Sequence, residues 1–280
     1  MKSLFISALF ILGISTMAFS QTYFVIHAKG IITNKTTGKN IKAGDKLSPT
    51  DELKFGSGDA VAVVMSREKG RMTLNGKKVV KNENGELMAF VNTVLFPMNS
   101  NLQMSTRAFG DKKEITNFKD FFESDDKKFV IVGNELTFDV GSKYPMSKKQ
   151  RFVYRYNALG RTIQKKIKYE GKSLKLRKHV LYKSKGEYIK AESVDTVDFY
   201  YYDEEKKIST KLATFSPVYL DEKELTVELN SLIKFLKGNN VMKGEELEVE
   251  IYKYIYDVYG KTDSQSLHRW LENNTELNTH

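Results

Sequence analysis

The feature that most constrains the fold is a series of short runs of strand-forming residues between residues 128 and 220. Turn residues separate the runs, and the strand candidates fit within about ninety residues, a density typical of a sandwich or barrel. The candidates are 128–140, 151–156, 163–169, 174–182, 197–202 and 208–215. We therefore predict an antiparallel β domain over residues 128–220.

Residues 22–74 contain shorter apolar runs that are broken by glycine, asparagine and aspartate. Turn residues recur here every eight to twelve positions or so, which is typical of small all-β packing. The clearest turns lie at 34–38 and 57–59. The fold class we expect is mainly β, with a small N-terminal β module, a second antiparallel sandwich or barrel, and a helical C-terminal part.

The N-terminal runs also follow a recognisable order. Gly30 precedes an apolar pair, Gly38 marks a turn, Gly-Asp-Lys-Leu follows at 44–47, and two apolar segments end at 74. This order over residues 22–74 resembles the periplasmic β domain of FecR-type sensor proteins and related envelope modules. The resemblance implies a β scaffold and does not imply transmembrane signalling.

The first twenty residues have the three parts of a secretory signal peptide. Lys2 supplies a positive charge, residues 4–14 are almost wholly apolar, and Ala18 and Ser20 stand before Gln21. The apolar run is about eleven residues long, whereas a membrane-spanning helix needs about 20. We expect cleavage before Gln21 and export to the periplasm or the cell exterior; an uncleaved anchor is the alternative.

Helical spacing is found in two places. Ile115, Phe118, Phe121 and Phe122 fit a short helix, which we expect to be a connector that closes a first domain at 21–127. The second place is 221–280, where leucines recur at helical spacing after a possible cap at Asp221. We predict that this helical segment packs on the β domain.

Two details of the helical segment depend on local signals. Residues 245–259 fit both an alternating strand and one face of a helix; the acidic residues at their start and Gly260 after their end favour a helix. Asp263 is expected to cap a last short helix.

The chain contains no cysteine among its 280 residues. Disulfides, cysteine-ligated zinc, iron–sulfur clusters and thiol nucleophiles are therefore excluded. An exported protein without disulfides depends on burial of apolar side chains, and about 260 residues supply enough for one or two cores.

The positive charge is concentrated in one part of the sequence. The whole chain has a formal net charge of +10. Residues 143–190 alone hold sixteen Lys and Arg against two acidic residues, a net charge of +14, whereas residues 191–257 have a net charge of −7.

Within this basic block, cations alternate with apolar residues, which places the two kinds on opposite faces of a strand. The candidate anion- or partner-binding residues are Arg151, Arg155, Lys175 and Arg177. One interpretation is a cationic sheet face that attracts an anionic polymer or an acidic protein. The other is a charged face that keeps a half-exposed sheet soluble and protects its edges.

Sequence motifs for catalysis, cofactors or metals are missing. The four histidines have no metal-ligand spacing, the serine–lysine pairs lack their companion motifs, and no complete phosphate loop is present. We predict no catalytic, cofactor-binding or metal-binding residues. Tyrosine-rich runs at 199–202 and 252–259 fit either glycan or protein recognition, or elements packed on both sides.

These observations lead to two functional hypotheses. The first is an exported, non-catalytic cell-envelope protein that binds or scaffolds an envelope protein or an anionic envelope polymer. Nucleic acid is not expected as a partner, because export separates the protein from it. The alternative is a hydrolase of cell-wall or glycan substrates whose acid and base are carboxylates brought together by folding.

Overall fold

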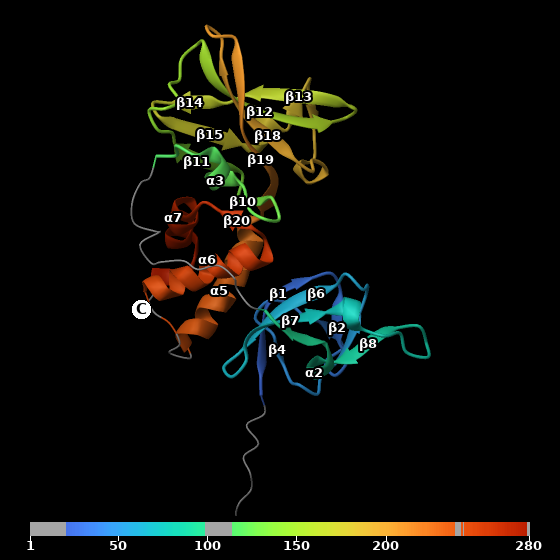
Figure 1. Ribbon diagram of the computed structural model, residues 1–280. Helices are drawn as coiled ribbons and strands as arrows, with labels where there is room; N and C mark the ends of the chain where they lie inside the picture. The colour runs from blue at the N-terminus through green and yellow to red at the C-terminus, as the bar shows by residue number, and fades with distance from the viewer. Residues whose placement is uncertain (1–20, 99–113, 239–241, 243, 279–280) are drawn as a thin grey trace, which may run out of the picture. The chain divides into compact units, whose positions relative to one another are not determined.

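The chain divides into two compact units, residues 1–98 and 99–280 (Figure 1). The computed structural model describes residues 21–98, 114–238, 242 and 244–278, so the predicted signal peptide at 1–20 lies outside the described residues. The boundary lies earlier than residue 127, where we expected the first domain to end. The reason is that helix α3 (Phe118–Phe122) packs against a strand of the second unit.

The first unit contains two antiparallel sheets around one apolar core. The first sheet has the order β4 (Lys46–Leu47), β1 (Tyr23–Lys29), β6 (Val61–Ser66), β7 (Gly70–Asn75) and β9 (Leu95–Pro97). The second has the order β3 (Lys39–Asn40), β2 (Ile32–Asn34), β5 (Glu52–Phe55) and β8 (Leu87–Phe90). A 3-10 turn at Gly76–Lys78 and helix α2 (Val91–Val94) complete the unit. Its predicted β-rich character is confirmed.

The second unit contains a six-stranded sheet, a three-stranded sheet and a small hairpin. The six-stranded sheet has the order β13 (Arg161–Lys166), β12 (Gln150–Ala158), β18 (Val197–Asp203), β19 (Ile208–Leu220), β10 (Lys128–Val132) and β20 (Lys261–Thr262). The three-stranded sheet has the order β11 (Glu135–Asp139), β15 (Ser173–Arg177) and β14 (Lys168–Glu170). The hairpin pairs β16 (Lys183–Ser184) with β17 (Glu187–Tyr188).

The two larger sheets pack face to face as a sandwich. Their common core contains Phe152 and Tyr154 from β12 together with Leu174 and Leu176 from β15. The six-stranded sheet is open, with β13 and β20 at its edges. We expected either a sandwich or a barrel. The described residues form the sandwich, and none of their sheets closes into a barrel. Pairing is mostly antiparallel, but β10 runs parallel to both β19 and β20.

The expected connector helix α3 is part of this core. Asn117 caps it by accepting hydrogen bonds from the backbone N–H groups of Lys119 and Asp120. Phe122 stacks on Phe215 of β19 at a ring-centroid distance of 4.2 Å, and its edge approaches Phe138 of β11 at 5.8 Å. Because one side chain contacts both sheets, α3 helps to hold the sandwich together.

The passage between the sheets depends on a glycine. Gly133 lies in the turn that carries the chain from β10 to β11 and has a φ of +73°. A side chain here would adopt a strained backbone conformation. It would also collide with the side chain of Glu222. The predicted continuous strand at 128–140 is consequently two strands that belong to different sheets.

Another expected strand, 174–182, is also shorter than predicted. Strand β15 ends at Arg177, and a four-residue helix, α4 (Lys178–Leu181), follows it. The helix turns the chain so that both Leu181 and Tyr182 are buried in the core. Alternation alone did not distinguish this inward turn from a continued strand.

The C-terminal part is helical, as predicted. It contains α5 (Glu222–Gly238), α6 (Glu245–Val258), α7 (Ser264–Asn274) and a last 3-10 turn (Glu276–Asn278). Asp221 caps α5 by accepting from the backbone N–H of Lys223 at 2.9 Å, and Asp263 caps α7 by accepting from that of Ser266 at 2.9 Å. Both predicted caps are confirmed, and the ambiguous segment 245–259 is a helix.

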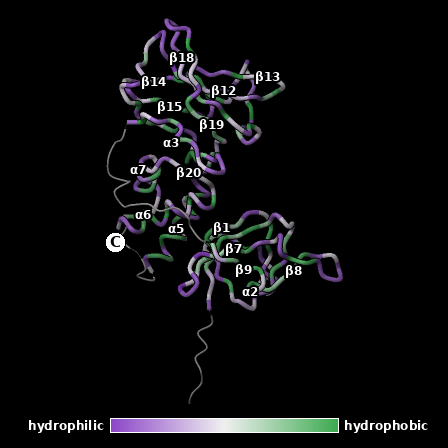
Figure 2. Tube along the Cα trace, in the orientation of Figure 1, coloured by the Kyte–Doolittle hydropathy of each residue, from purple (hydrophilic) through white to green (hydrophobic). Residues whose placement is uncertain are grey.

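These helices are tied to the sandwich through β20. The strand pairs with β10, and the Thr262 hydroxyl donates to the Val130 carbonyl at 3.0 Å. None of the helices in the described ranges is long and apolar enough to cross a membrane. In Figure 2 the strands change repeatedly between hydrophilic and hydrophobic residues, which is the pattern of sheets with one buried face.

Candidate functional site

The structure places the four predicted cations on two different surfaces. Arg151 and Arg155 lie on β12 of the six-stranded sheet, and Lys175 and Arg177 lie on β15 of the three-stranded sheet. The predicted alternation of Lys175 and Arg177 with buried leucines is confirmed, whereas Val153, the apolar residue between Arg151 and Arg155, lies on the same outer face as the two arginines. Because the core separates the two sheets, however, the cations form two faces instead of the single cationic face that we expected.

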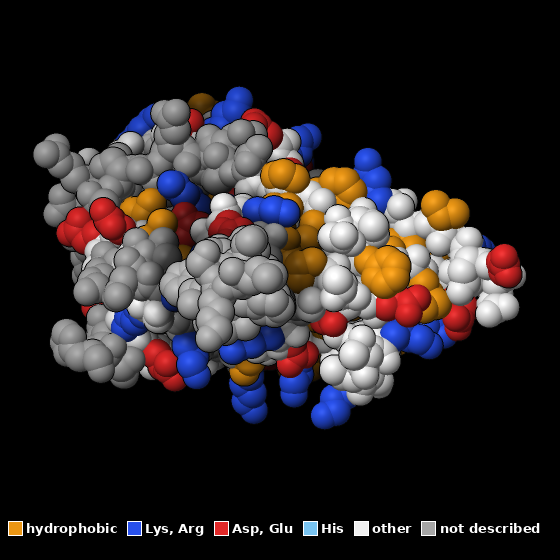
Figure 3. Space-filling model, turned by 90° about the horizontal axis from the view of Figure 1, so that it is seen from below, with side chains coloured by type: hydrophobic (Ala, Val, Ile, Leu, Met, Phe, Trp, Pro, Cys, Tyr) orange, Lys and Arg blue, Asp and Glu red, His pale blue; other side chains and the backbone are white. Residues whose placement is uncertain are grey.

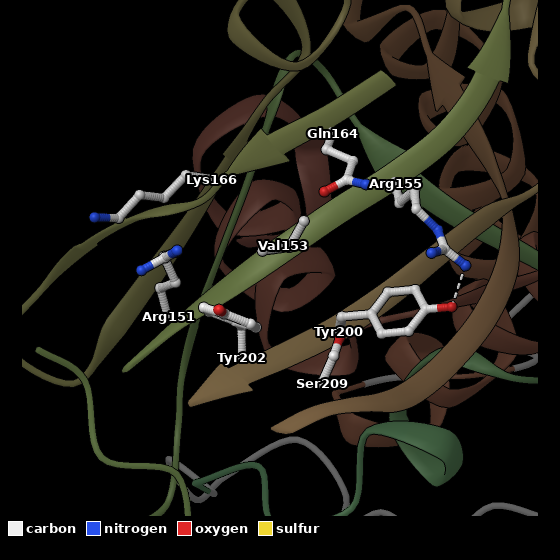
Figure 4. Close-up of a pocket in the computed structure, with 8 residues that line it drawn as sticks. All are labelled: Arg151, Val153, Arg155, Gln164, Lys166, Tyr200, Tyr202 and Ser209. Carbon is white, nitrogen blue, oxygen red and sulfur yellow. Dashed lines mark hydrogen bonds between the residues drawn. The ribbon is translucent and has the colours of Figure 1, made fainter. Parts of the chain in front are cut away.

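The outer face of the six-stranded sheet contains a shallow hollow of about 330 Å³. Four neighbouring strands, β13, β12, β18 and β19, supply its lining (Figure 4). The lining residues are Arg151, Val153, Arg155, Gln164, Lys166, Tyr200, Tyr202 and Ser209. We call this hollow the arginine–tyrosine groove.

Strand register brings these residues together. On one side of β12, Val153 lies opposite Lys166 and Arg155 opposite Gln164. On the other side, Arg151 lies opposite Tyr202 of β18. Directly opposed side chains on one sheet face are neighbours, so the groove is a continuous surface assembled from four strands.

Each groove arginine is stacked on a tyrosine. The guanidinium carbon of Arg151 lies 4.5 Å from the ring centre of Tyr202, and that of Arg155 lies 4.2 Å from the ring centre of Tyr200. Arg155 also donates a hydrogen bond to the Tyr200 hydroxyl. These cation–π contacts hold long, flexible side chains in place. Less side-chain conformational entropy is therefore lost when a ligand binds.

The aromatic run at 199–202 contributes both to the core and to the groove, two possibilities between which the sequence did not decide. Phe199 is fully buried in the core. Tyr200 and Tyr202 alternate with it and face the arginine–tyrosine groove. Alternation within the run could have indicated that some rings would point outward. It could not have indicated which cations would lie beside those rings.

An acidic side chain organises the Arg155 end of the groove. Asp198 accepts hydrogen bonds from Arg155 at 3.3 Å and from the Thr214 hydroxyl at 2.8 Å, and it also pairs with Lys211 at 2.5 Å. Partial burial acts to raise the pKa of Asp198, but the hydrogen bonds from Lys211, Thr214 and Arg155 outweigh it and lower this pKa below 3.8.

The acid at the Arg151 end is more exposed than Asp198, although Arg151 is itself less exposed than Arg155. Arg151 pairs with Glu204 at 2.7 Å, and the Glu204 side chain is 54% exposed. The Lys166 ammonium group makes no ion pair or hydrogen bond with any described residue. An exposed ion pair is worth little in water, so a ligand anion can compete for Arg151 at small cost.

The two cations on the three-stranded sheet have a different environment. Arg177 donates from Nε to Glu135 at 2.5 Å, and Lys175 pairs with Glu170 at 2.5 Å. Partial burial raises the pKa of Glu135, but hydrogen bonds from Arg177 and Thr137 lower it by more. Within the described chain, no aromatic ring is stacked on either cation. Each cation is therefore balanced by an acid and lacks the flat support present in the groove.

A second hollow, of about 380 Å³, lies in the first unit beside β5, β8 and α2. Its lining is mostly apolar, with one acid, Glu52, and one cation, Lys78. Exposed Val80 and Phe90 belong to this lining. Figure 3 shows hydrophobic side chains that reach the surface among charged ones in the view from below. This hollow does not concentrate charge of one sign.

The groups that line the arginine–tyrosine groove are mostly hydrogen-bond donors and aromatic rings. The eight described lining residues include no carboxylate and no histidine, the usual acids and bases of hydrolysis. Throughout the described part of the chain, no group of three histidine or acidic side chains is arranged to hold a metal ion. The groove offers guanidinium, ammonium, amide and hydroxyl donors beside aromatic rings.

Comparison with known proteins adds no relative. No protein-family model, no curated protein and no solved structure matches this chain. The resemblance of residues 22–74 to FecR-type envelope modules accordingly stays a prediction that depends on the sequence pattern alone.

Proposed function

We propose that this protein is an exported, non-catalytic binding protein of the cell envelope, and that its arginine–tyrosine groove holds an acidic glycan. The observation that carries the proposal is the position of Arg151, Arg155 and Lys166 around one hollow, beside two tyrosine rings. Cations attract carboxylate or phosphate groups, and arginine binds them through paired hydrogen bonds. Tyrosine adds a flat apolar surface with a polar tip, which suits a sugar ring.

The size of the groove supports a glycan over an acidic protein. A hollow of about 330 Å³ is at the lower end of the range for small-ligand sites, roughly 300–1,000 Å³. A stable protein partner needs a complementary surface of about 800 Å² on each side. Arg151 and Arg155 lie four residues apart on one strand, about 13 Å, which matches a short stretch of a sugar chain better than a broad interface.

Export is the part of the proposal that depends on residues 1–20. Their charged start, apolar run and small residues before Gln21 indicate a cleaved signal peptide. We expect N-terminal sequencing of the protein recovered from the producing cell's envelope or medium to begin at or near Gln21. A chain that retains Met1 and stays in the cytoplasm would contradict export and leave the binding test below unaffected.

The binding test uses the purified protein and polygalacturonate as the acidic glycan, measured by calorimetry. Charge-assisted hydrogen bonds are worth about 1.5–3 kcal/mol, so the double variant Arg151→Gln/Arg155→Gln is expected to weaken binding by at least about tenfold. The matched control is Lys175→Gln/Arg177→Gln, which removes the same charge from the other face and should change the affinity by less than about twofold.

Three outcomes would contradict the proposal. They are an equal loss in both double variants, affinity that stays the same between about 50 and 500 mM salt, and preference for a polyglutamate chain over the glycan. The last result would indicate an acidic protein partner. The chain length of the recovered polygalacturonate should be unchanged, because no carboxylate lines the described groove; shortening would support the hydrolase alternative.

A further inference from the structure

The two ends of the arginine–tyrosine groove differ in the acid that lies beside each arginine and in the presence of a second cation, Lys166, at one end. Figure 4 shows Lys166 and Arg151 at one end, and Arg155 with Tyr200 at the other. Lys166 lies opposite Val153, two residues along β12 from Arg151. Such diagonal neighbours on a sheet are about 7–8 Å apart, which is within reach of two long side chains.

At the Arg155 end a carboxylate, Asp198, lies beside the arginine, whose Nη1 and Nε have no partner among the described residues. One terminal nitrogen of Arg155 donates to both Asp198 and the Tyr200 hydroxyl. Asp198 also holds Lys211 and Thr214. An anion that approached Arg155 would therefore be repelled by the Asp198 carboxylate, which Lys211 and Thr214 hold in place.

At the Arg151 end the acid is more exposed and a second cation is present. The Lys166 ammonium group has three N–H donors and no partner among the described residues. Within the described residues Arg151 donates only from Nη1, to Glu204 and to the Lys148 carbonyl. Its Nη2 and Nε are therefore free to donate within the described chain, while the stack on Tyr202 keeps the guanidinium group in position.

We propose that Arg151 and Lys166 form an anion clamp that binds one carboxylate or phosphate group of the ligand, while a neutral part of the sugar lies over Val153 toward Gln164 and Tyr200. This inference rests on the proposed glycan-binding function and makes it more specific. The ligand class is a glycan with an anionic group on a terminal or branching sugar. Gln164 and Ser209 supply amide and hydroxyl groups for sugar hydroxyls.

The experiment compares single variants with three trisaccharide probes by calorimetry. One probe has a terminal galacturonate, the second a terminal sugar phosphate, and the third a neutral terminal galactose. Arg151→Gln and Lys166→Gln should each weaken binding of a charged probe by about tenfold and leave the weak binding of the neutral probe unchanged. Arg155→Gln should weaken it by no more than about threefold, because its charge is shared with Asp198.

Two further variants serve as controls. Lys168→Gln removes an exposed lysine two residues along the chain from Lys166, on β14 of the three-stranded sheet, and it should have no effect. Glu204→Gln removes the acid that competes for Arg151 and should strengthen binding about twofold. Thermal unfolding of every variant checks that the fold is retained. The better of the two charged probes identifies the anionic group as a carboxylate or a phosphate.

The results separate this inference from the proposed function. If polygalacturonate binds but Arg155→Gln is as damaging as Lys166→Gln, or if Lys166→Gln has no effect, the clamp is wrong and the glycan-binding function stands. If wild-type protein binds neither the polymer nor any charged probe, both are wrong.

Discussion

The two outer faces of the same sandwich carry the same kind of sequence and have different properties. Strands β12 and β15 both alternate cations with buried apolar residues. On the six-stranded sheet, the neighbouring strand β18 presents Tyr200 and Tyr202, and a hollow forms. On the three-stranded sheet, the neighbouring strands β11 and β14 present Glu135 and Glu170, which pair with the cations, and no ring is stacked on either cation in the described residues. The difference shows that the partner strand decides what a row of cations can do.

The largest effect is expected where both faces depend on one side chain. Phe122 lies in the core and contacts rings from both sheets, so Phe122→Ala should lower the free energy of unfolding of the second unit by about 3–5 kcal/mol. Urea unfolding measures this. The control is Phe90→Ala in the first unit, a half-exposed residue that should cost less than about 1 kcal/mol. Equal small costs would mean that the two sheets do not share a core.

The next largest effect is expected when a tyrosine is removed from beneath a groove arginine. It tests whether the stacked rings cause the difference between the two faces. Tyr202→Leu removes the ring under Arg151, and we expect about a three- to tenfold loss of polygalacturonate affinity, because a mobile guanidinium group costs more entropy to fix. Tyr188→Leu is the matched control, since Tyr188 contacts Lys183 by a similar stack but lies outside the groove lining. An equal loss in both variants would show that the ring acts through general stability.

Lowering the pH should distinguish Asp198 on the six-stranded sheet from Glu135 on the three-stranded sheet. The pKa of Asp198 is lowered in the folded protein, so its contribution is fully present above its usual pKa of 3.8 and is lost as the pH falls through the lower folded value. The free energy of unfolding of the wild type should therefore fall below about pH 4. In Asp198→Asn this fall should be smaller, by about 1 kcal/mol or less. We expect a weaker change for Glu135→Gln, whose ion pair with Arg177 is more exposed. Urea unfolding at several pH values gives both curves, and parallel curves for wild type and Asp198→Asn would contradict this role.

The smallest effect is expected from a variant that makes the outer face of the three-stranded sheet more like that of the six-stranded sheet. Glu135→Gln/Glu170→Gln removes the acids that pair with Arg177 and Lys175. We expect less than about a twofold gain in polygalacturonate affinity, because freed exposed cations without supporting rings remain mobile. The gain should disappear at high salt. A gain comparable to the affinity of the groove would show that charge alone, without the tyrosines, is sufficient.

Sequence patterns predicted the elements whose cause lies within a few residues. Asp221 and Asp263 cap their helices because a short side chain reaches backbone N–H groups two or three residues ahead. The acids that begin α6 and the glycine after it indicated a helix correctly. The alternation along β15 predicted that Lys175 and Arg177 would point outward and that the leucines alternating with them would be buried.

Other features depended on contacts between distant segments. Burial of Leu181 and Tyr182 replaced an expected strand end with helix α4. The phenylalanines of α3 had helical spacing, but their burial between two sheets, and hence the place of α3 in the second unit, was not visible in that spacing. The separation of the four cations into two faces had the same origin, because alternation assigns a face to each strand and does not assign strands to sheets.

The sequence by itself thus determined the periodicities, the caps and the concentration of positive charge between 143 and 190. The tertiary structure alone decided that Arg155 would contact a tyrosine 45 residues away, and that Lys175 and Arg177 would lie on the opposite face beside acids. The physical reason is that helix caps and strand alternation are set by neighbours along the chain, whereas sheet partners are chosen by the burial of a whole core.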